Sequence, residues 1–320
     1  MTSFGPVTGD VIGNVQFKDG SVSFAQSVGG ANTPGKIYYV DRNIGVSGNG
    51  ESWGKAFKTF QEAITKVNAD YTNTVAPSNG RNRWIFVGEG WYAETPSTLT
   101  ASDVTIVGVA PGSHDSTVIY GVPVAGTYSG IAGGPTLTMN CSNCTIMNMG
   151  FYCSDVLYAA IRDGANASDA DVSAVKTAYN NKYINCSFVR DTADGELGGI
   201  DCVGVEGPVI QGCRFSTSCK TFGIRIRTNG VVNPVGVQIK DCKFVGTETG
   251  VIKSAGSDCI IEHCLFIDDI TDRADTITTP VTNEGNQLIL IDNYWEFSDA
   301  NAITGNGDHL NINNNTLAKT

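Results

Sequence analysis

The sequence predicts an all-β solenoid, a fold in which similar coils of chain stack along one axis. A short motif recurs along the chain and consists of an aliphatic residue, any residue, a small polar residue, a cysteine, any residue and an aromatic residue. From residue 151 onward, successive aromatic positions lie 22 to 37 residues apart, a spacing typical of coils that bury their apolar sides against each other. The clear copies are YINCSF at 183–188, IQGCRF at 210–215, IKDCKF at 239–244 and IEHCLF at 261–266, with degenerate copies at 106–109, 146–151, 290–295 and 312–317.

Within each copy, the apolar residues alternate with other residues, which indicates strands and not helices. Val237 and Ile239 precede a polar residue that can bend the chain, and Cys242 and Phe244 follow it. Glycine, asparagine and aspartate gather between the copies, as in SAGSD at 254–258, and they readily adopt the left-handed backbone angles that tight turns need. We therefore predict two or three short strands per coil.

One helix is predicted upstream of the repeats, at about 53–68. Its apolar residues lie three and four positions apart, and lysines lie off that stripe, as in an amphipathic helix. Ser52 is available as its N-terminal cap. We expect this helix to cover the first coil. The apolar stripe consists of Ala56, Phe57, Phe60, Ala63, Ile64 and Val67.

The repeat resembles that of the right-handed parallel β-helix, or pectin-lyase-like, proteins over about residues 36–317. The segment YYVDRNIGVSGNGESWGKAFKTFQEAI at 38–64 is similar to the entry segment of many β-helix proteins of bacteria and their phages. The resemblance implies an all-β right-handed parallel β-helix with an N-terminal capping α-helix. We accordingly divide the chain into a short N-terminal arm, 1–35, and a β-helix body, 36–320.

The repeated cysteines raise the question of a metal or thiol site. Residues at equivalent positions of a repeat form a column along the rod, whereas a metal ion needs ligands that converge on one point. We therefore predict that Cys186, Cys213, Cys242 and Cys264 are buried small hydrophobic residues, and we predict no metal and no cofactor. His263 is expected to be a bend residue. The aromatic column beside the cysteines is predicted to contain Phe151, Phe188, Phe215, Phe244, Phe266 and Trp295.

The composition restricts the setting in which the protein acts. The 32 acidic and 21 basic residues give a net charge of −11, which argues against nucleic acid as a partner. No apolar run is long enough to span a membrane. Ten cysteines, together with an N-terminus that lacks a secretion signal, favour synthesis in the reducing host cytoplasm.

Catalytic residues are hard to identify in this sequence. The resemblance would imply stacked carboxylates on an outer face, and the outward positions of the motif carry none. The best candidate is Asp201, which is expected between Arg162 and Arg225 of adjacent coils. The alternative is an ion-pair ladder without function, which we favour. The complete set of candidates, should the protein be an enzyme, is Asp201, Asp191, Asp194, Glu196, Glu206 and Arg225.

The arm lacks the repeat but contains alternating apolar residues around KDGS at 18–21, as a β-hairpin would. We favour an arm that docks on another protein or packs in a homo-oligomer, over a flexible leader. The predicted partner-binding residues are Val11, Ile12, Val15, Phe17, Val22 and Phe24.

A β-helix with such an arm resembles phage virion proteins. We predict a structural protein of the virion surface, a capsid decoration or cement protein, with other virion proteins such as the major capsid protein as partners and a homotrimer as the assembly. The alternatives are a tailspike or fibre that binds or depolymerises host surface glycans, and a glycan-binding module without catalysis. The last coil, Leu310 to Lys319, is expected to be shielded by a neighbouring subunit, a virion partner or a returning loop.

Overall fold

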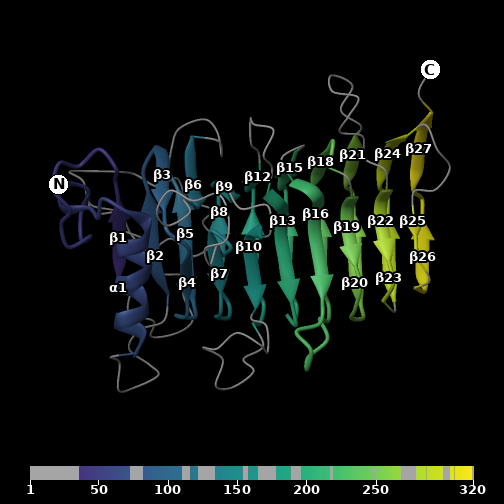
Figure 1. Ribbon diagram of the computed structural model, residues 1–320, viewed down its shortest axis with the longest axis horizontal. Coiled ribbons are helices and arrows are strands. Elements are labelled where there is room, and N and C mark those ends of the chain that lie inside the picture. Colours follow the sequence, from purple (N-terminus) through teal and green to yellow (C-terminus); the bar gives the residue numbers. More distant parts are fainter. Residues whose placement is uncertain are drawn as a thin grey trace, which may run out of the picture.

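The fold is the predicted right-handed parallel β-helix. The computed structural model describes residues 36–72, 82–109, 116–121, 134–153, 158–164, 178–188, 196–216, 219–247, 249–267, 279–285, 287–297, 303–305 and 307–318. Over these residues the strands form three parallel sheets that run along the rod, and one α-helix lies at its N-terminal end (Figure 1). The family resemblance seen in the sequence therefore holds for the architecture.

Each complete coil passes through sheet 1, then sheet 2, then sheet 3. Over the described residues, sheet 1 has ten strands: β1 Ile37–Val40, β2 Arg83–Val87, β5 Val104–Gly108, β8 Thr145–Met147, β11 Lys182–Ile184, β14 Val209–Gln211, β17 Gln238–Lys240, β20 Cys259–Glu262, β23 Leu288–Ile291 and β26 His309–Ile312. Sheet 2 has nine: β3 Gly90–Glu94, β6 Thr117–Gly121, β9 Gly150–Cys153, β12 Ser187–Phe188, β15 Arg214–Phe215, β18 Lys243–Val245, β21 Leu265–Ile267, β24 Tyr294–Phe297 and β27 Asn315–Ala318. Sheet 3 has eight: β4 Ser97–Leu99, β7 Leu137–Met139, β10 Ala159–Gly164, β13 Glu196–Val203, β16 Cys219–Arg227, β19 Thr249–Lys253, β22 Thr279–Asn283 and β25 Ile303–Thr304.

Two of the three corners turn through left-handed residues. At the 1–2 corner, between sheets 1 and 2, the polar residue of the motif has φ between 49° and 64°, and His263 is one of these residues, as predicted. At the 3–1 corner, between sheet 3 and the next strand of sheet 1, a second column has φ between 50° and 67°. Asn, Asp and Gly predominate at both corners because they tolerate this backbone conformation. The 3–1 column consists of Asp103, Asn143, Asn180, Gly207, Gly236, Asp258 and Gln287.

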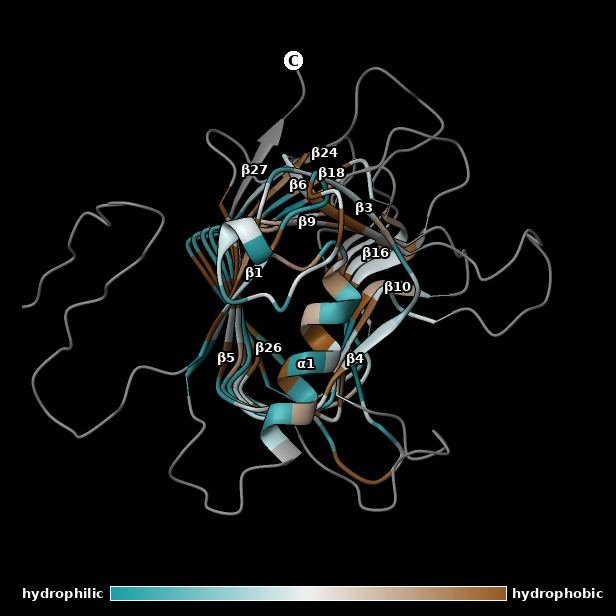
Figure 2. Cartoon of the chain, turned by 90° about the vertical axis from the view of Figure 1, so that its left-hand side faces the viewer, coloured by the Kyte–Doolittle hydropathy of each residue, from teal (hydrophilic) through white to brown (hydrophobic). Residues whose placement is uncertain are grey.

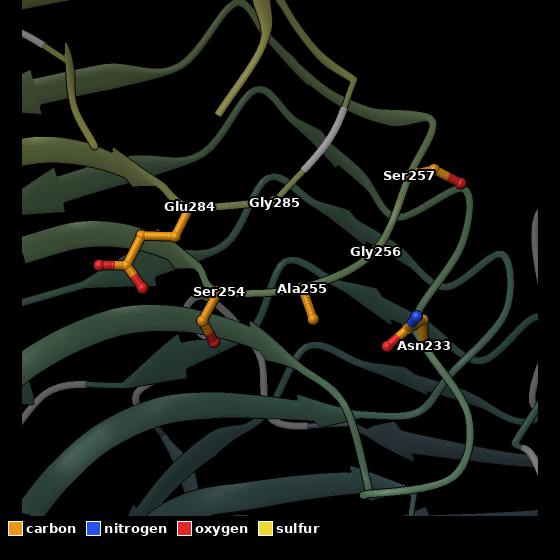
Figure 3. Close-up of a pocket in the computed structure, with 7 residues that line it drawn as sticks. All are labelled: Asn233, Ser254, Ala255, Gly256, Ser257, Glu284 and Gly285. Atoms are coloured by element: carbon orange, nitrogen blue, oxygen red, sulfur yellow. The ribbon is translucent and has the colours of Figure 1, made fainter. Parts of the chain in front are cut away.

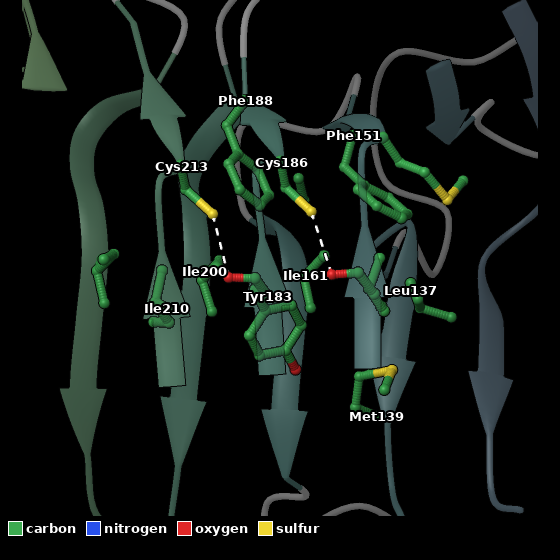
Figure 4. Close-up of a cluster of buried hydrophobic side chains, with 14 of the residues drawn as sticks. Leu137, Met139, Phe151, Ile161, Tyr183, Cys186, Phe188, Ile200, Ile210 and Cys213 are labelled. Atoms are coloured by element: carbon green, nitrogen blue, oxygen red, sulfur yellow. Dashed lines mark hydrogen bonds between the residues drawn. The ribbon is translucent and has the colours of Figure 1, made fainter. Parts of the chain in front are cut away.

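The interior consists of columns of like side chains, as the repeat predicted. The four motif cysteines are buried, and each thiol lies within hydrogen-bond distance of carbonyls, as Cys213 Sγ does of Tyr183 O at 3.4 Å (Figure 4). The phenylalanines stack beside them, with ring centroids 4.8 Å apart for Phe188 and Phe215 and 4.7 Å apart for Phe244 and Phe266. This closely packed interior is the core that holds the coils together.

The capping helix begins later than predicted. Trp53–Lys55 form a separate 3-10 turn, Ser52 makes no capping hydrogen bond with its side chain, and α1 spans Phe60–Thr72. Thr59 and Glu62 form a capping box that starts the helix, because Glu62 Oε2 accepts a hydrogen bond from Thr59 N at 3.0 Å and Thr59 Oγ1 accepts one from Glu62 N at 3.2 Å. The predicted apolar stripe is buried, and α1 covers the N-terminal end of the rod (Figure 2).

The C-terminal coil is shifted by one residue from the motif alignment. The motif places Ile312 with Leu290, but the sheet register pairs Ile312 with Ile291 and Asn311 with Leu290. A shift of one residue moves every side chain to the other face of a strand. Leu310 and Ile312 therefore lie on the outer face of sheet 1, with exposed fractions of 56% and 38%. No helix in the described part of the chain is long and apolar enough to cross a membrane.

Candidate functional site

Charged side chains gather on the outer face of sheet 3, along one column of paired strands. The register aligns Arg162 of β10 with Asp201 of β13, and Asp201 with Arg225 of β16, as the sequence analysis expected. Arg227 lies two residues further along β16, opposite Val203. These four residues are the first candidate site.

Asp201 is nearly buried and receives hydrogen bonds from two arginines. Arg225 donates to both carboxylate oxygens, at 2.9 Å from Nε and 2.7 Å from NH2. Arg227 also donates to both, at 3.0 Å from Nε to Oδ1 and 2.8 Å from NH2 to Oδ2. Burial opposes ionisation, but the guanidinium groups prevail and hold the pKa of Asp201 below its usual range.

This geometry suits a structural ion pair better than catalysis. A general acid needs a raised pKa and a free path to the substrate, whereas Asp201 is ionised and its oxygens are engaged. Arg225 is also engaged, because its guanidinium lies 4.5 Å from the centroid of the Phe222 ring. The sequence analysis paired Asp201 only with its direct neighbours in the register and did not consider Arg227, which is a diagonal neighbour on the same face of the sheet.

The other sequence candidates are placed in part. Glu206 lies at the 3–1 corner, where it is exposed and pairs with Tyr179 and Val235 in isolated parallel bridges. Glu196 begins β13, and its side chain lies outside the described residues, as do Asp191 and Asp194. The arm residues Val11, Ile12, Val15, Phe17, Val22 and Phe24 also lie outside them.

A polar pocket of about 290 Å³ opens at the 3–1 corner, further along the rod (Figure 3). It lies where β19 and β22 leave sheet 3, beside the loop that precedes β17. Figure 3 shows Glu284 and Ser254 at one side and Ser257 and Asn233 at the other. The remaining lining residues are Ala255, Gly256 and Gly285.

The floor of the pocket requires glycine because it covers a buried lysine. Lys253 is fully buried, and its Nζ donates hydrogen bonds to Gly256 O at 2.9 Å and Asn283 Oδ1 at 3.4 Å. A Cβ atom at Gly285 would lie 2.4 Å from that Nζ and 3.0 Å from the backbone carbon of Ala255, so the lysine side chain would have to shift. Gly256 has φ of +96°, and a Cβ there would lie 2.2 Å from Pro234 O. Burial lowers the pKa of the Lys253 amine.

Glu206 and Glu284, two exposed carboxylates of this corner, are too far apart to act as a hydrolytic pair. The bridges and strand pairings place Glu206 and Glu284 three coils apart. Three coils amount to about 14 Å along the rod. Glycoside hydrolysis uses carboxyl groups roughly 5 to 9.5 Å apart. Among the described residues, no group of three or more histidine, cysteine, aspartate or glutamate side chains is arranged to hold a metal ion.

Sequence reasoning did not identify the pocket. Ser254 to Asp258 were noted as a turn, and Asn233 and Glu284 lie in turns of two other coils. The only signal available was the polar composition of the turns, which is the same in functional and ordinary turns. Their proximity depends on the stacking of three successive coils, and a single motif does not encode it.

Comparisons with known proteins agree on the architecture. No protein-family model matches the sequence, and no curated protein matches it. Among solved structures, an alginate lyase from Paenibacillus sp. is 13% identical, with a TM-score of 0.52, over 79% of this chain and 93% of that chain. The Escherichia coli protein ybhc is 9% identical, also with a TM-score of 0.52, over 95% of this chain and 90% of that chain. At this identity the likeness shows the fold alone.

Proposed function

We propose that this chain is a glycan-binding β-helix protein without hydrolase or lyase activity, and that it acts on a virion surface. The observation that carries the binding function is the polar pocket at the 3–1 corner. Its hydroxyl groups, amide and carboxylate can exchange hydrogen bonds with the hydroxyl groups of a sugar. Gly256 and Gly285 complete its lining, where larger side chains would collide with Pro234 and Lys253.

The carboxylate geometry supports binding without cleavage. Asp201 is held by Arg225 and Arg227, so it is available neither as an acid nor as a nucleophile. Glu206 and Glu284 lie on different coils. A β-helix of similar fold is an alginate lyase, so this architecture is compatible with a polysaccharide ligand.

Binding can be tested with the full chain and a panel of neutral, amino and acidic tetrasaccharides. At least one class is expected to bind with a Kd in the micromolar to millimolar range. Asn233→Ala and Glu284→Gln should each weaken binding several-fold, because each removes a polar group from the pocket. Asp292→Asn, a partly exposed position at the 1–2 corner, is the matched control. Failure of every class to bind would overturn the proposal.

The absence of cleavage is measured separately. Polysaccharides incubated with the protein should show no new reducing ends and no unsaturated products. Products that disappear in Asp201→Asn would make the protein an enzyme and Asp201 a catalytic residue. That outcome would favour the tailspike alternative.

An exposed apolar surface supports the assembly role. On the outer face of sheet 1, one column contains Ile260, Ile289 and Leu310 in register, and the next contains Ile291 and Ile312. Contiguous apolar residues on a surface usually mark a protein interface. They support packing against other virion proteins, such as a major capsid protein, or in a homotrimer.

Attachment is tested with a chain that lacks residues 1–35. We expect this chain to fold, because its repeats are intact, but no longer to bind particles that lack the protein. The mass of the full chain in solution should be three times that of one chain. Equal binding by the truncated chain would place the attachment surface on the β-helix.

A further inference from the structure

The pocket continues into a strip of side chains along the 3–1 corner. Isolated parallel bridges connect Tyr179 to Glu206, Glu206 to Val235, and Val235 to Ser257, which lines the pocket. The backbone holds this path through hydrogen bonds such as Glu206 N to Ala178 O at 3.0 Å and Val235 N to Val205 O at 2.9 Å. We name the bridged residues and the pocket residues together the corner strip.

The corner strip offers apolar faces as well as polar groups. Tyr179 and Val235 have exposed fractions of 43% and 37%, which are high for large apolar side chains. The ring of a tyrosine packs against the C–H face of a sugar and its hydroxyl group exchanges hydrogen bonds, so both sides of a saccharide find partners. Successive coils lie about 4.8 Å apart, which is close to the length of one sugar residue in a glycan chain.

The strip spans several coils. From Tyr179 to the coil of Glu284 there are four steps between coils. Four steps amount to about 19 Å along the rod axis, enough for a chain of about four sugar residues. A disaccharide would cover only half of that length.

The charge of the strip restricts which glycan it can take. Glu206 and Glu284 are exposed, and Asp258 is exposed beside Ser257, whose hydroxyl donates a hydrogen bond to it at 3.0 Å. None of the residues that define the corner strip is a lysine or an arginine, and the whole chain has a net charge of −11. A polyuronate would meet like charges along the strip, whereas an amino sugar would meet opposite ones.

We infer that the corner strip binds an amino-sugar oligosaccharide of about four residues along the rod axis, with the pocket at one end and Tyr179 at the other. This inference rests on the proposed glycan-binding function and names its ligand class and footprint. A ligand lying along the axis contacts one coil per sugar residue. The stacked coils therefore define the register of the glycan.

The experiment compares four probes on the full chain by isothermal titration calorimetry. These are a glucosamine tetrasaccharide, an N-acetylglucosamine tetrasaccharide, a galacturonate tetrasaccharide and a glucosamine disaccharide. We expect the first to bind about fivefold more tightly than the second at low salt, the scale of one or two exposed charge pairs. The third should bind at least tenfold more weakly than the first. The disaccharide should also bind at least tenfold more weakly, because it leaves half of the strip empty.

Two substitutions separate the strip from the pocket. Tyr179→Ala should weaken the glucosamine and N-acetylglucosamine tetrasaccharides alike, about fivefold to tenfold, and leave the disaccharide less affected. Glu206→Gln should abolish most of the preference for glucosamine over N-acetylglucosamine. The matched controls are Tyr294→Ala, whose tyrosine is 44% exposed on sheet 2, and Asp292→Asn at the 1–2 corner, and both should bind as the unmodified chain does.

The outcomes distinguish this inference from the proposed function. Binding that depends on Asn233 and Glu284 but not on Tyr179 or Glu206 would overturn the strip and leave glycan binding in place. Equal affinity for the galacturonate and glucosamine tetrasaccharides would overturn the ligand class alone. If neither these probes nor any other member of the glycan panel binds, the proposed function fails and the inference fails with it.

Discussion

Two aspartates on neighbouring strands of sheet 3 have opposite surroundings. Asp201 points outward and lies against two arginines, and its pKa is lowered. Asp163 lies on the neighbouring strand β10 and pairs with Cys202, the residue that follows Asp201. Its side chain points inward and is fully buried. Asn181 donates a hydrogen bond to Asp163 Oδ1 at 2.8 Å, and the Tyr183 hydroxyl lies beside the carboxyl group.

Burial without a cation raises the pKa of Asp163 to about 6. Both carboxyl groups are removed from water, so burial alone does not decide their charge. The neighbouring groups decide it, because two guanidinium groups contact Asp201, whereas Asn181 and Tyr183 lie beside Asp163. The inner face is packed mainly with apolar side chains and includes a few buried polar groups such as Asp163 and Lys253, whereas the outer face tolerates many residue types.

The largest expected effect tests the packing of the inner face. Phe244→Ala should lower the free energy of unfolding by about 3 to 5 kcal/mol, because it leaves a cavity in the stack between Phe215 and Phe266. Leu265→Ala, on the outer face of the adjacent coil, should cost less than about 1.5 kcal/mol. Denaturant unfolding of both variants is the measurement. Equal losses would remove the distinction between the two faces.

The next prediction concerns the inward aspartate. The pKa of Asp163 rises from 3.8 to about 6 on folding. Its ionisation therefore destabilises the folded state increasingly as the pH rises from about 4 to 6. Above about pH 6 the full loss, up to about 3 kcal/mol, is reached. Asp163→Asn should therefore increase the free energy of unfolding by up to that amount at pH 8 and by little at pH 4. Asp308→Asn, at an exposed position, provides the comparison. A gain that is the same at both pH values would mean that ionisation of Asp163 is not the cause.

Replacing the outward aspartate, Asp201, should have a smaller effect of opposite sign, because it should lower the free energy of unfolding. Its pKa is lowered on folding, so its stabilisation is present above about pH 4 and is lost as the pH falls towards its lower folded value. Asp201→Asn should cost about 1 to 3 kcal/mol at pH 7, because two arginines lose a charged partner, and much less at pH 2. Denaturant unfolding curves of the variant and the parent at pH 7 and pH 2 would measure this difference in stability. A variant as stable as the parent at pH 7 would show that the ion pair contributes nothing.

The sequence by itself determined the coils, their columns and their turns. The Cys and Phe positions recur because every coil must present the same small and aromatic side chains to its neighbours, so the pattern is visible in each copy. The pattern was lost in the last coil, where strand β26 is exposed along its length and alternation is no longer enforced by burial. The start of α1 was also predictable in principle, since the capping box of Thr59 and Glu62 is a local signal.

Only the tertiary structure decided the site. The pocket joins turns of three coils, and the corner strip joins Tyr179 to Ser257 across a separation of 78 residues in the chain. Their contact depends on the register of successive coils and on loops of different lengths between them. Arg227 lies on the same face of β16 as Arg225 and reaches Asp201 as a diagonal neighbour, a contact that the register of the two strands decides. Surface residues face few packing constraints, so their positions in the sequence carry little information about which of them meet in space.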